Sequence, residues 1–411
     1  MELLHRVCCG LDVHKKNVVA CLRRSKPGEE AEQEVRTFAT TTRGLLELQE
    51  WLIVAKCTHV AMESTGVYWR PVYNILEGSL EVLVVNARHI KAVPGRKTDV
   101  KDCEWIADLL AHGLLQASFV PPKPIRELRE LTRHRRVLIE ERARKANRVQ
   151  KVLETANIKL GDVATDVLGV SGRKMLQALA AGERDPEKLA DLAVGSLREK
   201  REELREALLG KFTEHHGFML ESLLREIEFL EKEIEIFDKR IEEKMRPFSQ
   251  ELERLDQIPG VGRRSAEQII AELGPDMNRF RTAGHAASWA GICPGNNESA
   301  GKRRSGKTRK GNAWLHATLV ECARAGIRKR DSYISAQYNH LVRRRGDKKA
   351  IVAVAHTILV DVWHMLRYNL EYKDLGANYF DCINRDRLVR YHLKRLESLG
   401  YQVTLQEAAM Q

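Results

Sequence analysis

The chain has 411 residues, enough for two or three domains. Its 69 Lys and Arg residues against 57 Asp and Glu residues give a net charge of +12, which favours a polyanionic partner, usually nucleic acid. We expect a cytoplasmic protein without a membrane span, because no apolar run approaches the ~20 residues of a spanning helix and the N-terminus lacks a signal-peptide layout. The eight cysteines show no CxxC pair or zinc-like spacing, which argues against a structural zinc or a disulfide framework.

The first part of the chain alternates short apolar runs with helical patterns. Residues 6–25 are rich in Val and Cys and predict two strands joined by a tight turn near His14–Asn17. The elements predicted next are helices at 42–55 and 67–78 and buried strands at 58–64 and 80–87. Strands that alternate with helices indicate an α/β domain around a central sheet.

A short helix and a long basic helix are predicted next. Residues 97–115 carry apolar side chains close to helical spacing, and the prolines of the following PPKP segment interrupt the chain. Residues 125–156 predict one continuous helix in which Lys and Arg outnumber Glu. Such a run is either a solvated helix face or a nucleic-acid contact, for which Arg135 and Arg136 are the candidate residues.

Residues 160–250 are helical in character throughout. From Leu220 to Ile241, apolar residues recur at alternating steps of three and four, which is the a/d pattern of a coiled coil. This seam packs either within the chain, as an antiparallel hairpin, or against a second chain. We favour a dimerising role for it.

Residues 255–274 have the pattern of a helix-hairpin-helix, with the turn IPGVG between two helices. Gly260 and Gly262 have no Cβ, so amides of the turn can approach a DNA phosphate closely, and Arg263 and Arg264 follow directly. The alternative is an ordinary tight turn between helices. As a DNA contact the motif would grip the backbone without reading sequence.

The stretch CPGNNESAGKRRSGKTRKGN, residues 293–312, contains four glycines and six basic residues, and it places Ser299 just before the densest charge. A flexible basic loop binds phosphate, so Ser299 is a linker residue, a hydrogen-bond donor to a phosphate or a nucleophile that attacks one. The basic residues predicted to contact nucleic acid here are Lys302, Arg303, Arg304, Lys307, Arg309 and Lys310.

Four acidic residues form the candidate metal site. Asp12 lies inside the first predicted strand, where a carboxylate is costly to bury unless it is paired or bound to a cation. Glu63 ends a later strand, and Asp99 and Asp102 share one face of a helix. Each acid alone could be exposed, but together they can converge at one sheet edge and hold Mg²⁺, or Mn²⁺ in its place. Two such ions stabilise an in-line displacement at phosphorus, as in the ribonuclease-H-like, RuvC-like arrangement.

Long motifs along most of the chain resemble the DEDD transposases of bacterial insertion sequences, the IS110 family with its IS1111 branch. The N-terminal motifs are GLDVHKKNVVACL, VAMESTGVYWRPVYNILE and VNARHIKAVPGRKTDVKDCEWIADLLAHGLL, and the C-terminal ones are IPGVGRRSAEQIIAELG and FRTAGHAASWAGICPGNNESAGKRRSGKTRKGNAWLHATLVECA. By this resemblance the DEDD acids are Asp12, Glu63, Asp99 and Asp102. The family's serine loop often reads Ser-Ser-Gly-Gly-Lys and reads ESAGK here, so Ser299 matches the nucleophile and Ser305 is the alternative.

The resemblance implies DNA strand exchange. A serine hydroxyl attacks a phosphodiester to give a phosphoserine-linked DNA end and a free 3′-hydroxyl, and the reverse reaction rejoins exchanged ends without ATP. Mg²⁺ held by the acids would orient the phosphate and stabilise developing charge. The resemblance also implies a structured guide RNA that pairs with double-stranded donor and target DNA, a homodimer that assembles into a tetramer, and action at the bacterial nucleoid.

Four segments are predicted. They are a RuvC-like α/β catalytic domain with the long basic helix (1–158), a helical dimerisation region (159–250), a mainly α-helical transposase domain with the helix-hairpin-helix and the serine loop (251–372), and a tail (373–411).

Two other functions fit parts of the sequence: a metal-dependent DNA-junction nuclease that uses water, with Ser299 only binding phosphate, and a non-catalytic DNA-binding scaffold. The presence of all four acids argues against the scaffold, and a covalent protein–DNA adduct would distinguish serine chemistry from hydrolysis.

Overall fold

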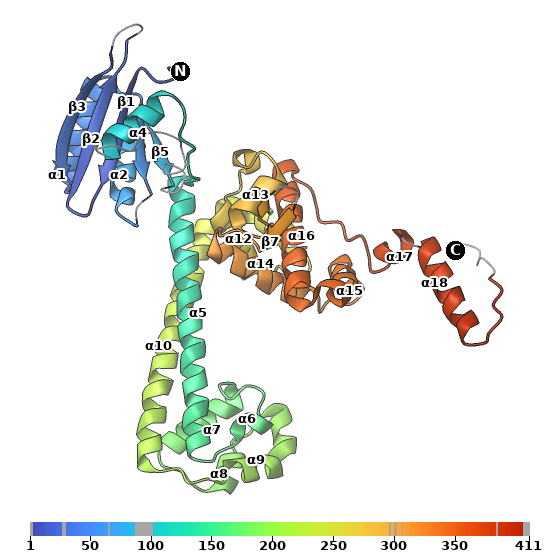
Figure 1. The fold of residues 1–411 in the computed structure, drawn as a ribbon. Coiled ribbons are helices and arrows are strands. Elements are labelled where there is room, and N and C mark those ends of the chain that lie inside the picture. The colour runs from blue at the N-terminus through green and yellow to red at the C-terminus, as the bar shows by residue number, and fades with distance from the viewer. Residues whose placement is uncertain are drawn as a thin grey trace. The chain divides into compact units, whose positions relative to one another are not determined.

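The computed structural model describes residues 3–26, 30–64, 66–86, 102–295, 297–299, 302–305, 307–383 and 385–405, with the backbone alone for 297–299 and 302–305. Contacts within the chain divide it into two compact units, Met1–Pro121 and Pro122–Gln411 (Figure 1). The first predicted boundary lay after the long basic helix, at residue 158. The contacts instead group that helix with the C-terminal unit.

A five-stranded mixed sheet forms the centre of the first unit, in the spatial order β3-β2-β1-β4-β5. Its strands are β1 (Val7–Val13), β2 (Asn17–Arg24), β3 (Glu32–Ala39), β4 (His59–Glu63) and β5 (Glu81–Val85). The first three pair antiparallel, while β4 and β5 run parallel to β1 and are reached through helical connections. The predicted turn is confirmed, since the His14 amide donates to the Asn17 carbonyl at 2.9 Å.

Helices cover both faces of this sheet. They are α1 (Thr42–Val54), α2 (Trp69–Leu76) and α4 (Asp102–Ala111). α1 and α2 pack on the face that carries Leu11 and Met62, and α4 packs on the opposite face with Cys8 and Ala61. Because successive strand residues point to opposite sides, β1 is apolar on both faces, and Asp12 interrupts that pattern.

The sequence predicted most elements of this unit, and the structure confirms its four strands and the helices near 42–55 and 67–78. It did not predict β3, whose sequence EQEVRTFA is mostly polar and partly exposed. An edge strand buries few of its own side chains, so the local pattern is weak. Pairing along the length of β2 holds β3 in the sheet.

Two long antiparallel helices, α5 (Lys123–Thr155) and α10 (Glu214–Met245), form a hairpin in the second unit (Figure 1). The a/d residues of α10 pack on α5; Leu230 and Ile234, for example, are buried with Leu138. The seam is therefore an intrachain hairpin, the first of the two predicted alternatives. Dimerisation through this region stays a prediction and would have to use side chains outside the buried seam.

Short helices cap the far end of this hairpin. They are α6 (Leu160–Val163), α7 (Val170–Ala180), α8 (Pro186–Ala190), η1 (Gly195–Lys200) and α9 (Arg201–Leu208). One buried cluster joins them to both long helices, through Val149 and Leu153 of α5 and Leu223 and Ile227 of α10. The cap and the hairpin thus share a hydrophobic core.

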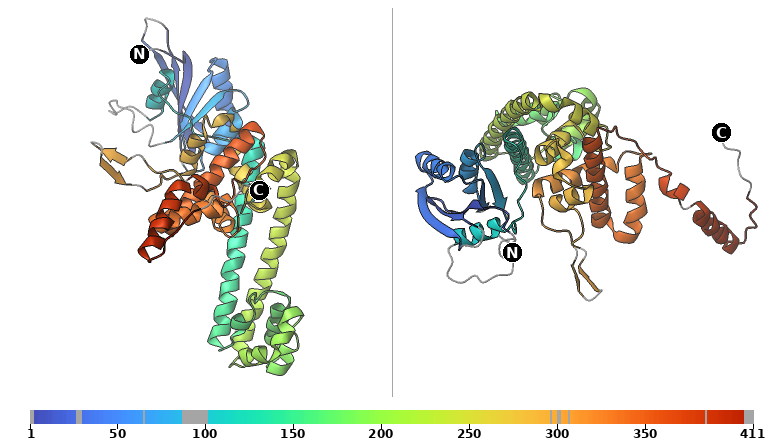
Figure 2. Two further views of the ribbon diagram at one scale, coloured as in Figure 1. Left: turned by 90° about the vertical axis from the view of Figure 1, so that its right-hand side faces the viewer. Right: turned by 90° about the horizontal axis from the view of Figure 1, so that it is seen from above.

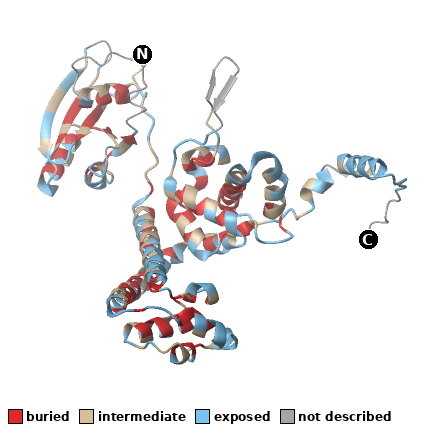
Figure 3. Cartoon of the chain, turned by 60° about the horizontal axis from the view of Figure 1, so that its bottom comes forward, coloured by how far each residue is buried: buried red, intermediate tan, exposed pale blue. Residues whose placement is uncertain are grey.

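The C-terminal part of the second unit consists mainly of helices. They are η2 (Arg246–Phe248), α11 (Ser249–Asp256), α12 (Arg263–Leu273), η3 (Met277–Arg279), α13 (Ala283–Ala290), α14 (Ala313–Gly326), α15 (Tyr333–Arg345), α16 (Asp347–Tyr368), α17 (Tyr379–Ile383) and α18 (Arg385–Ser398). Among the described residues α16 alone is long and apolar enough to cross a membrane, and 56% of its apolar window is buried inside the protein. Its buried side faces α13, α14 and α15, as a core helix does (Figure 3).

Candidate active site

Asp12 and Glu63 lie side by side at one edge of the sheet. β1 and β4 are parallel, and their last paired residues are Leu11 and Met62. The next residue of each strand is an acid, so the two carboxylates occupy neighbouring positions at the carboxyl ends of these strands. In open α/β sheets this is the edge at which ligands bind.

α4 packs on the face of the sheet that carries Cys8 and Ala61, and it brings a third acid, Asp102, towards this edge. A Cβ on Gly10 would lie 2.1 Å from the Cys103 carbonyl oxygen, so the glycine lets α4 lie directly against β1. Further back on the strand, Cys8 Sγ donates to the Ala107 carbonyl at 3.6 Å. α4 therefore runs antiparallel to β1, and its first turn, which begins at Asp102, lies nearest to Asp12.

The electrostatics of α4 also reflect the closeness of Asp12. Burial raises the pKa of the Cys103 thiol, and the carboxylates of Glu104 and Asp12 raise it further. Asp12 also pairs with His14, whose Nε2 lies 3.1 Å from Asp12 Oδ2, with the Asp12 side chain 31% exposed. Sequence reasoning missed this histidine, which lies in the turn just after β1; its position two residues after Asp12 was the available signal.

The donor set at this edge suits a hard cation. Asp12, Glu63 and Asp102 come from three elements that meet there, and carboxylate oxygens are the ligands that Mg²⁺ prefers. Asp99 lies outside the described residues. Within the described ranges, no group of three or more His, Cys, Asp or Glu residues is close enough to hold a metal ion. The three acids thus fit the chemistry of a magnesium site without completing one by themselves.

Ser299 lies at the tip of a small hairpin. β6 (Asn297–Ser299) pairs antiparallel with β7 (Lys302–Ser305), and Ser299 pairs with Lys302 beside the turn. Ser305 pairs with Asn297 at the other end of the hairpin. The two strands project from the helices of their unit (Figure 2).

The two stems of this hairpin contact each other at several of the described residues. The Gly295 amide donates to the Lys307 carbonyl at 2.9 Å, and Pro294 and Thr308 form a bridge. At the base, a Cβ on Gly311 would lie 2.4 Å from the Gly291 nitrogen, so the stems touch there. The predicted basic residues are Lys302, Arg303 and Arg304 on β7 and the exposed Lys307, Arg309 and Lys310 on the second stem. We call residues 292–311 the serine arm.

The predicted helix-hairpin-helix segment consists of α11, a tight turn and α12. Gly260 in this turn has a φ of 87°, and a Cβ there would lie 2.2 Å from the Cys322 carbonyl oxygen on α14. Packing against α14 therefore accounts for this glycine, and approach of a DNA phosphate is not needed to explain it. A Cβ on Gly262 would meet nothing within 4 Å, so the space beside the start of α12 is open.

Arg263 and Arg264 pair with acids of α10. Arg263 Nη2 lies 3.1 Å from Glu242 Oε1, and Arg264 Nη2 lies 2.5 Å from Asp238 Oδ2. Their side chains remain 63% and 58% exposed, so a phosphate could replace the carboxylates. Both stay predicted nucleic-acid contacts.

Arg135 does not fit the prediction that it contacts nucleic acid. It is 1% exposed, and its Nη1 donates to Glu267 at 2.6 Å and to Asp238 at 2.9 Å. Arg136 is also largely covered, at 15% side-chain exposure, and pairs with Glu321 on α14. This part of the basic run joins α5 to α10, α12 and α14 through internal ion pairs, which a charge count along the sequence cannot distinguish from an exposed patch.

Two family models match the chain in separate regions. A transposase model of the DEDD type, IS110, matches residues 9–158, and the model "Transposase IS116/IS110/IS902 family" matches residues 252–339. The two regions together make up more than half of the chain. The first holds Asp12, Glu63, Asp99 and Asp102, and the second holds Ser299.

Two curated proteins are similar to the chain. The Sinorhizobium fredii protein named "Putative transposase y4pF/y4sB" is 30% identical over 125 residues, which are 29% of this chain and 32% of that protein. The Streptomyces clavuligerus protein named "Insertion element IS116 uncharacterized 44.8 kDa protein" is 26% identical over 326 residues, 70% of this chain and 79% of that protein. The chain thus spans about a third of the first relative and most of the second. Taken with the two family models, these matches show that the chain belongs to the IS110/IS116 family of insertion-element transposases.

Proposed function

We propose that the protein cleaves, exchanges and rejoins DNA strands of its insertion element through a phosphoserine intermediate on Ser299. The observation that carries this proposal is the position of Ser299 at the tip of a basic hairpin, in a chain whose sheet edge carries neighbouring Asp12 and Glu63 carboxylates. The hairpin can approach a DNA backbone, and the basic residues around it neutralise phosphate charge. The acids supply the oxygen ligands for a metal-assisted reaction at phosphorus.

The cleavage step conserves the number of covalent bonds and protons. Ser299 Oγ forms a bond to phosphorus while the bond between phosphorus and the 3′ oxygen breaks. The serine hydroxyl loses one proton and the departing 3′ oxygen gains one. In the reverse step the 3′-hydroxyl of an exchanged strand attacks the phosphoserine and releases the serine, so the sequence needs no ATP.

Asp12, Glu63, Asp102 and Asp99 would hold Mg²⁺, with Mn²⁺ as a possible substitute. When bound, the ion supplies electrostatic stabilisation for the negative charge that develops on the phosphate oxygens. The protein's own contribution is to place carboxylates from β1, β4 and the first turn of α4 at one edge of the sheet.

The proposal includes double-stranded donor and target DNA, a structured guide RNA, a homodimer that assembles into a tetramer, and action at the nucleoid in the cytoplasm. The net charge of +12 supports polyanion binding as such. Base specificity would rest largely with the RNA, because the described basic residues are suited to phosphate contact.

The test is formation of a covalent protein–DNA adduct on a recombination substrate, read on a denaturing gel. We expect Ser299→Ala to abolish the adduct, because alanine has no hydroxyl to attack phosphorus. Ser305→Ala is the matched control, and we expect it to form the adduct, since Ser305 lies at the other end of the hairpin. Strand exchange by Ser299→Ala at the wild-type rate would rule out the serine mechanism. Cleavage without any adduct in the unmodified protein would favour the hydrolytic junction nuclease.

A further inference from the structure

A buried carboxylate lies where the serine arm returns to the helices. Glu272, near the end of α12, is 2% exposed. A carboxylate is rarely buried to this extent unless its charge is paired and its oxygens accept hydrogen bonds. Its partners therefore indicate what the residue joins.

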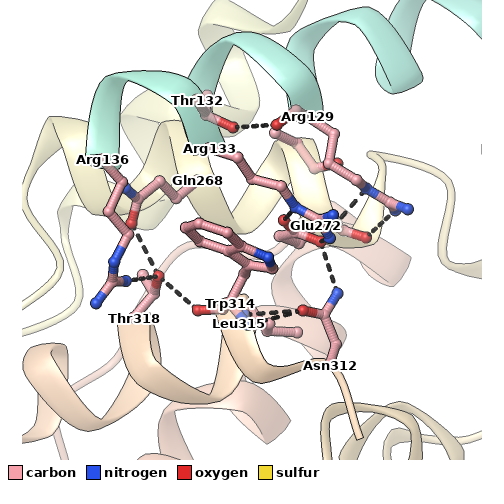
Figure 4. Close-up of polar contacts among 11 residues, drawn as sticks. Arg129, Thr132, Arg133, Arg136, Gln268, Glu272, Asn312, Trp314, Leu315 and Thr318 are labelled. Atoms are coloured by element: carbon pink, nitrogen blue, oxygen red, sulfur yellow. Dashed lines mark hydrogen bonds and ion pairs between the residues drawn. The ribbon is translucent and has the colours of Figure 1, made fainter. Parts of the chain in front are cut away.

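Two arginines of α5 pair with Glu272 (Figure 4). Arg133 donates from Nε to Oε1 at 2.6 Å and from Nη2 to Oε2 at 2.8 Å, which is a bidentate pair. Arg129 places Nε 3.3 Å from Oε2 and donates from Nη2 to the Glu272 carbonyl at 2.6 Å. The guanidinium of Arg133 also lies over the Trp314 ring, 5.4 Å from its centroid. The bidentate ion pair joins α5 to α12, and the cation–π contact joins α5 to α14. Both interactions depend on the orientation of the Arg133 guanidinium.

The third partner of the carboxylate is Asn312, the residue that follows the serine arm. Its Nδ2 donates to Glu272 Oε2 at 2.6 Å. Its Oδ1 accepts from the Trp314 and Leu315 amides and so caps α14. One side chain thus ends the arm, starts a helix and contacts the buried carboxylate.

The same residue also joins the two segments that flank the arm at its base. The Asn312 amide donates to the Trp289 carbonyl at 3.1 Å, directly beside the close contact of Gly291 and Gly311. A shift of Asn312 would therefore move both stems. The direction in which the hairpin leaves the helices depends on this point.

We propose that Glu272 is a positioning residue for strand cleavage, and that its bonds to Arg133 and Asn312 hold the base of the serine arm in a fixed direction relative to α5. This inference rests on the proposed role of Ser299. The arm is held at its base, so a small rotation there is amplified at the tip. Misplacement of a reacting atom by about 1 Å can lower a rate about a hundredfold.

The most specific variant is Asn312→Asp. Aspartate caps a helix about as well as asparagine, so α14 keeps its N-cap, but it cannot donate to Glu272 and places a second carboxylate against it. The double variant Glu272→Gln with Asn312→Asp reverses the donor and acceptor between these two side chains and keeps one carboxylate in the cluster. The glutamine loses the bidentate pair with Arg133, because its amide nitrogen then faces the Arg133 Nη2 donor. Thr318→Val is the local control, because Thr318 donates to Gln268 in the same cluster and has no hydrogen bond to Asn312 in the structure.

The full-length protein is assayed for the rate of adduct formation, DNA affinity and melting temperature. We expect Asn312→Asp to form the adduct at least about tenfold more slowly at saturating DNA and to melt at a lower temperature, because two carboxylates then meet at a buried site. DNA affinity should stay close to wild type. The double variant should recover part of the rate, and Thr318→Val should keep the wild-type rate. A wild-type rate in Asn312→Asp, or a loss of DNA affinity that parallels the loss of rate, would overturn the proposal.

Hydrogen exchange separates this inference from the serine mechanism itself. Asn312→Asp should speed exchange of two backbone amides: that of Gly295, which bonds across the stems to Lys307, and that of residue 312, which bonds to Trp289 at the base of the arm. Amides in the middle of α12 should stay protected. This readout needs no chemistry, so it applies even if Ser299→Ala still forms the adduct and the proposed function fails. Unchanged exchange at both stem amides would also overturn the positioning role.

Discussion

Asp12 shows how much a single residue can indicate. Four of the five residues of β1 that precede Asp12 are buried, and a carboxylate in such a strand needs a partner. The structure gives it a histidine partner, Glu63 in the neighbouring register position and the first turn of α4 nearby. Asp12 thus lies next to a second carboxylate at the carboxyl ends of β1 and β4, with its side chain 31% exposed.

Replacing Asp12 by Asn should therefore block chemistry and spare binding. We expect Asp12→Asn to lower strand exchange by more than about a hundredfold, because it removes a charged oxygen ligand at the proposed metal site. DNA affinity should change less than about threefold, since the basic residues are untouched. The control is Glu81→Gln, which removes an exposed acid at the opposite end of the parallel strands. Full activity of Asp12→Asn, or of the wild type in EDTA, would contradict the metal site.

The raised pKa of Asp361, on α16, makes the free energy of unfolding depend on pH. Burial, and then the nearby charge of Asp374, raise the pKa of Asp361 from 3.8 to about 6. The folded state binds this proton more tightly than the unfolded state does. The associated stability is therefore fully present below pH 3.8 and is lost as the pH rises through about 6.

Asp361→Asn should remove this pH dependence. A shift of this size corresponds to about 3 kcal/mol, so we expect the variant to be more stable than wild type by up to that amount at pH 8 and nearly equal to it at pH 4. Melting temperatures of both proteins across this range measure the effect. Parallel pH profiles for the two proteins would show that Asp361 does not titrate as described.

At the scale of elements, α4 depends on a single glycine of β1. Gly10→Ala would place a Cβ 2.1 Å from the Cys103 carbonyl, so the helix that carries Asp102 must move. Overpacking of this kind costs about 1 to 3 kcal/mol. We expect a lower melting temperature and a loss of strand exchange.

The matched control for this substitution is Gly78→Ala. A Cβ at Gly78 would meet nothing within 4 Å, so we expect its stability and activity to stay close to wild type. Unfolding experiments and adduct formation measure both variants. Equal behaviour of Gly10→Ala and Gly78→Ala would mean that close packing of α4 on β1 is not required.

The sequence predicted the helices and strands better than the tertiary contacts between them. The strands that carry Asp12 and Glu63, and the helix that became α5, follow from local apolar periodicity. β3 was missed because its sequence is mostly polar and the strand is held in the sheet by backbone pairing with β2, which leaves no local apolar pattern. The burial of Arg135 and the cluster around Glu272 could not be predicted, because they depend on contacts between residues more than a hundred positions apart. Glu272 is, in the sequence alone, one acid in an ordinary helix.

At the scale of the whole molecule, the proposed chemistry is divided between two units. The carboxylates of the sheet edge belong to Met1–Pro121, and the serine arm belongs to Pro122–Gln411. The two family models match the same two regions, one over the acids and one over the serine. Neither unit carries all the groups that the proposed reaction needs, so we expect activity to require both.

The most direct test of this account is to locate the DNA on the protein after cleavage. A substrate with a bridging sulfur at the 3′ position of the cleavage site would trap the intermediate, since the thiol that leaves rejoins poorly to the phosphoserine. Mass spectrometry of the digested adduct should then find the nucleotide on the peptide that contains Ser299, and only when Mg²⁺ is present. A nucleotide on another residue, or free 5′-phosphate ends with no modified peptide, would contradict the serine mechanism.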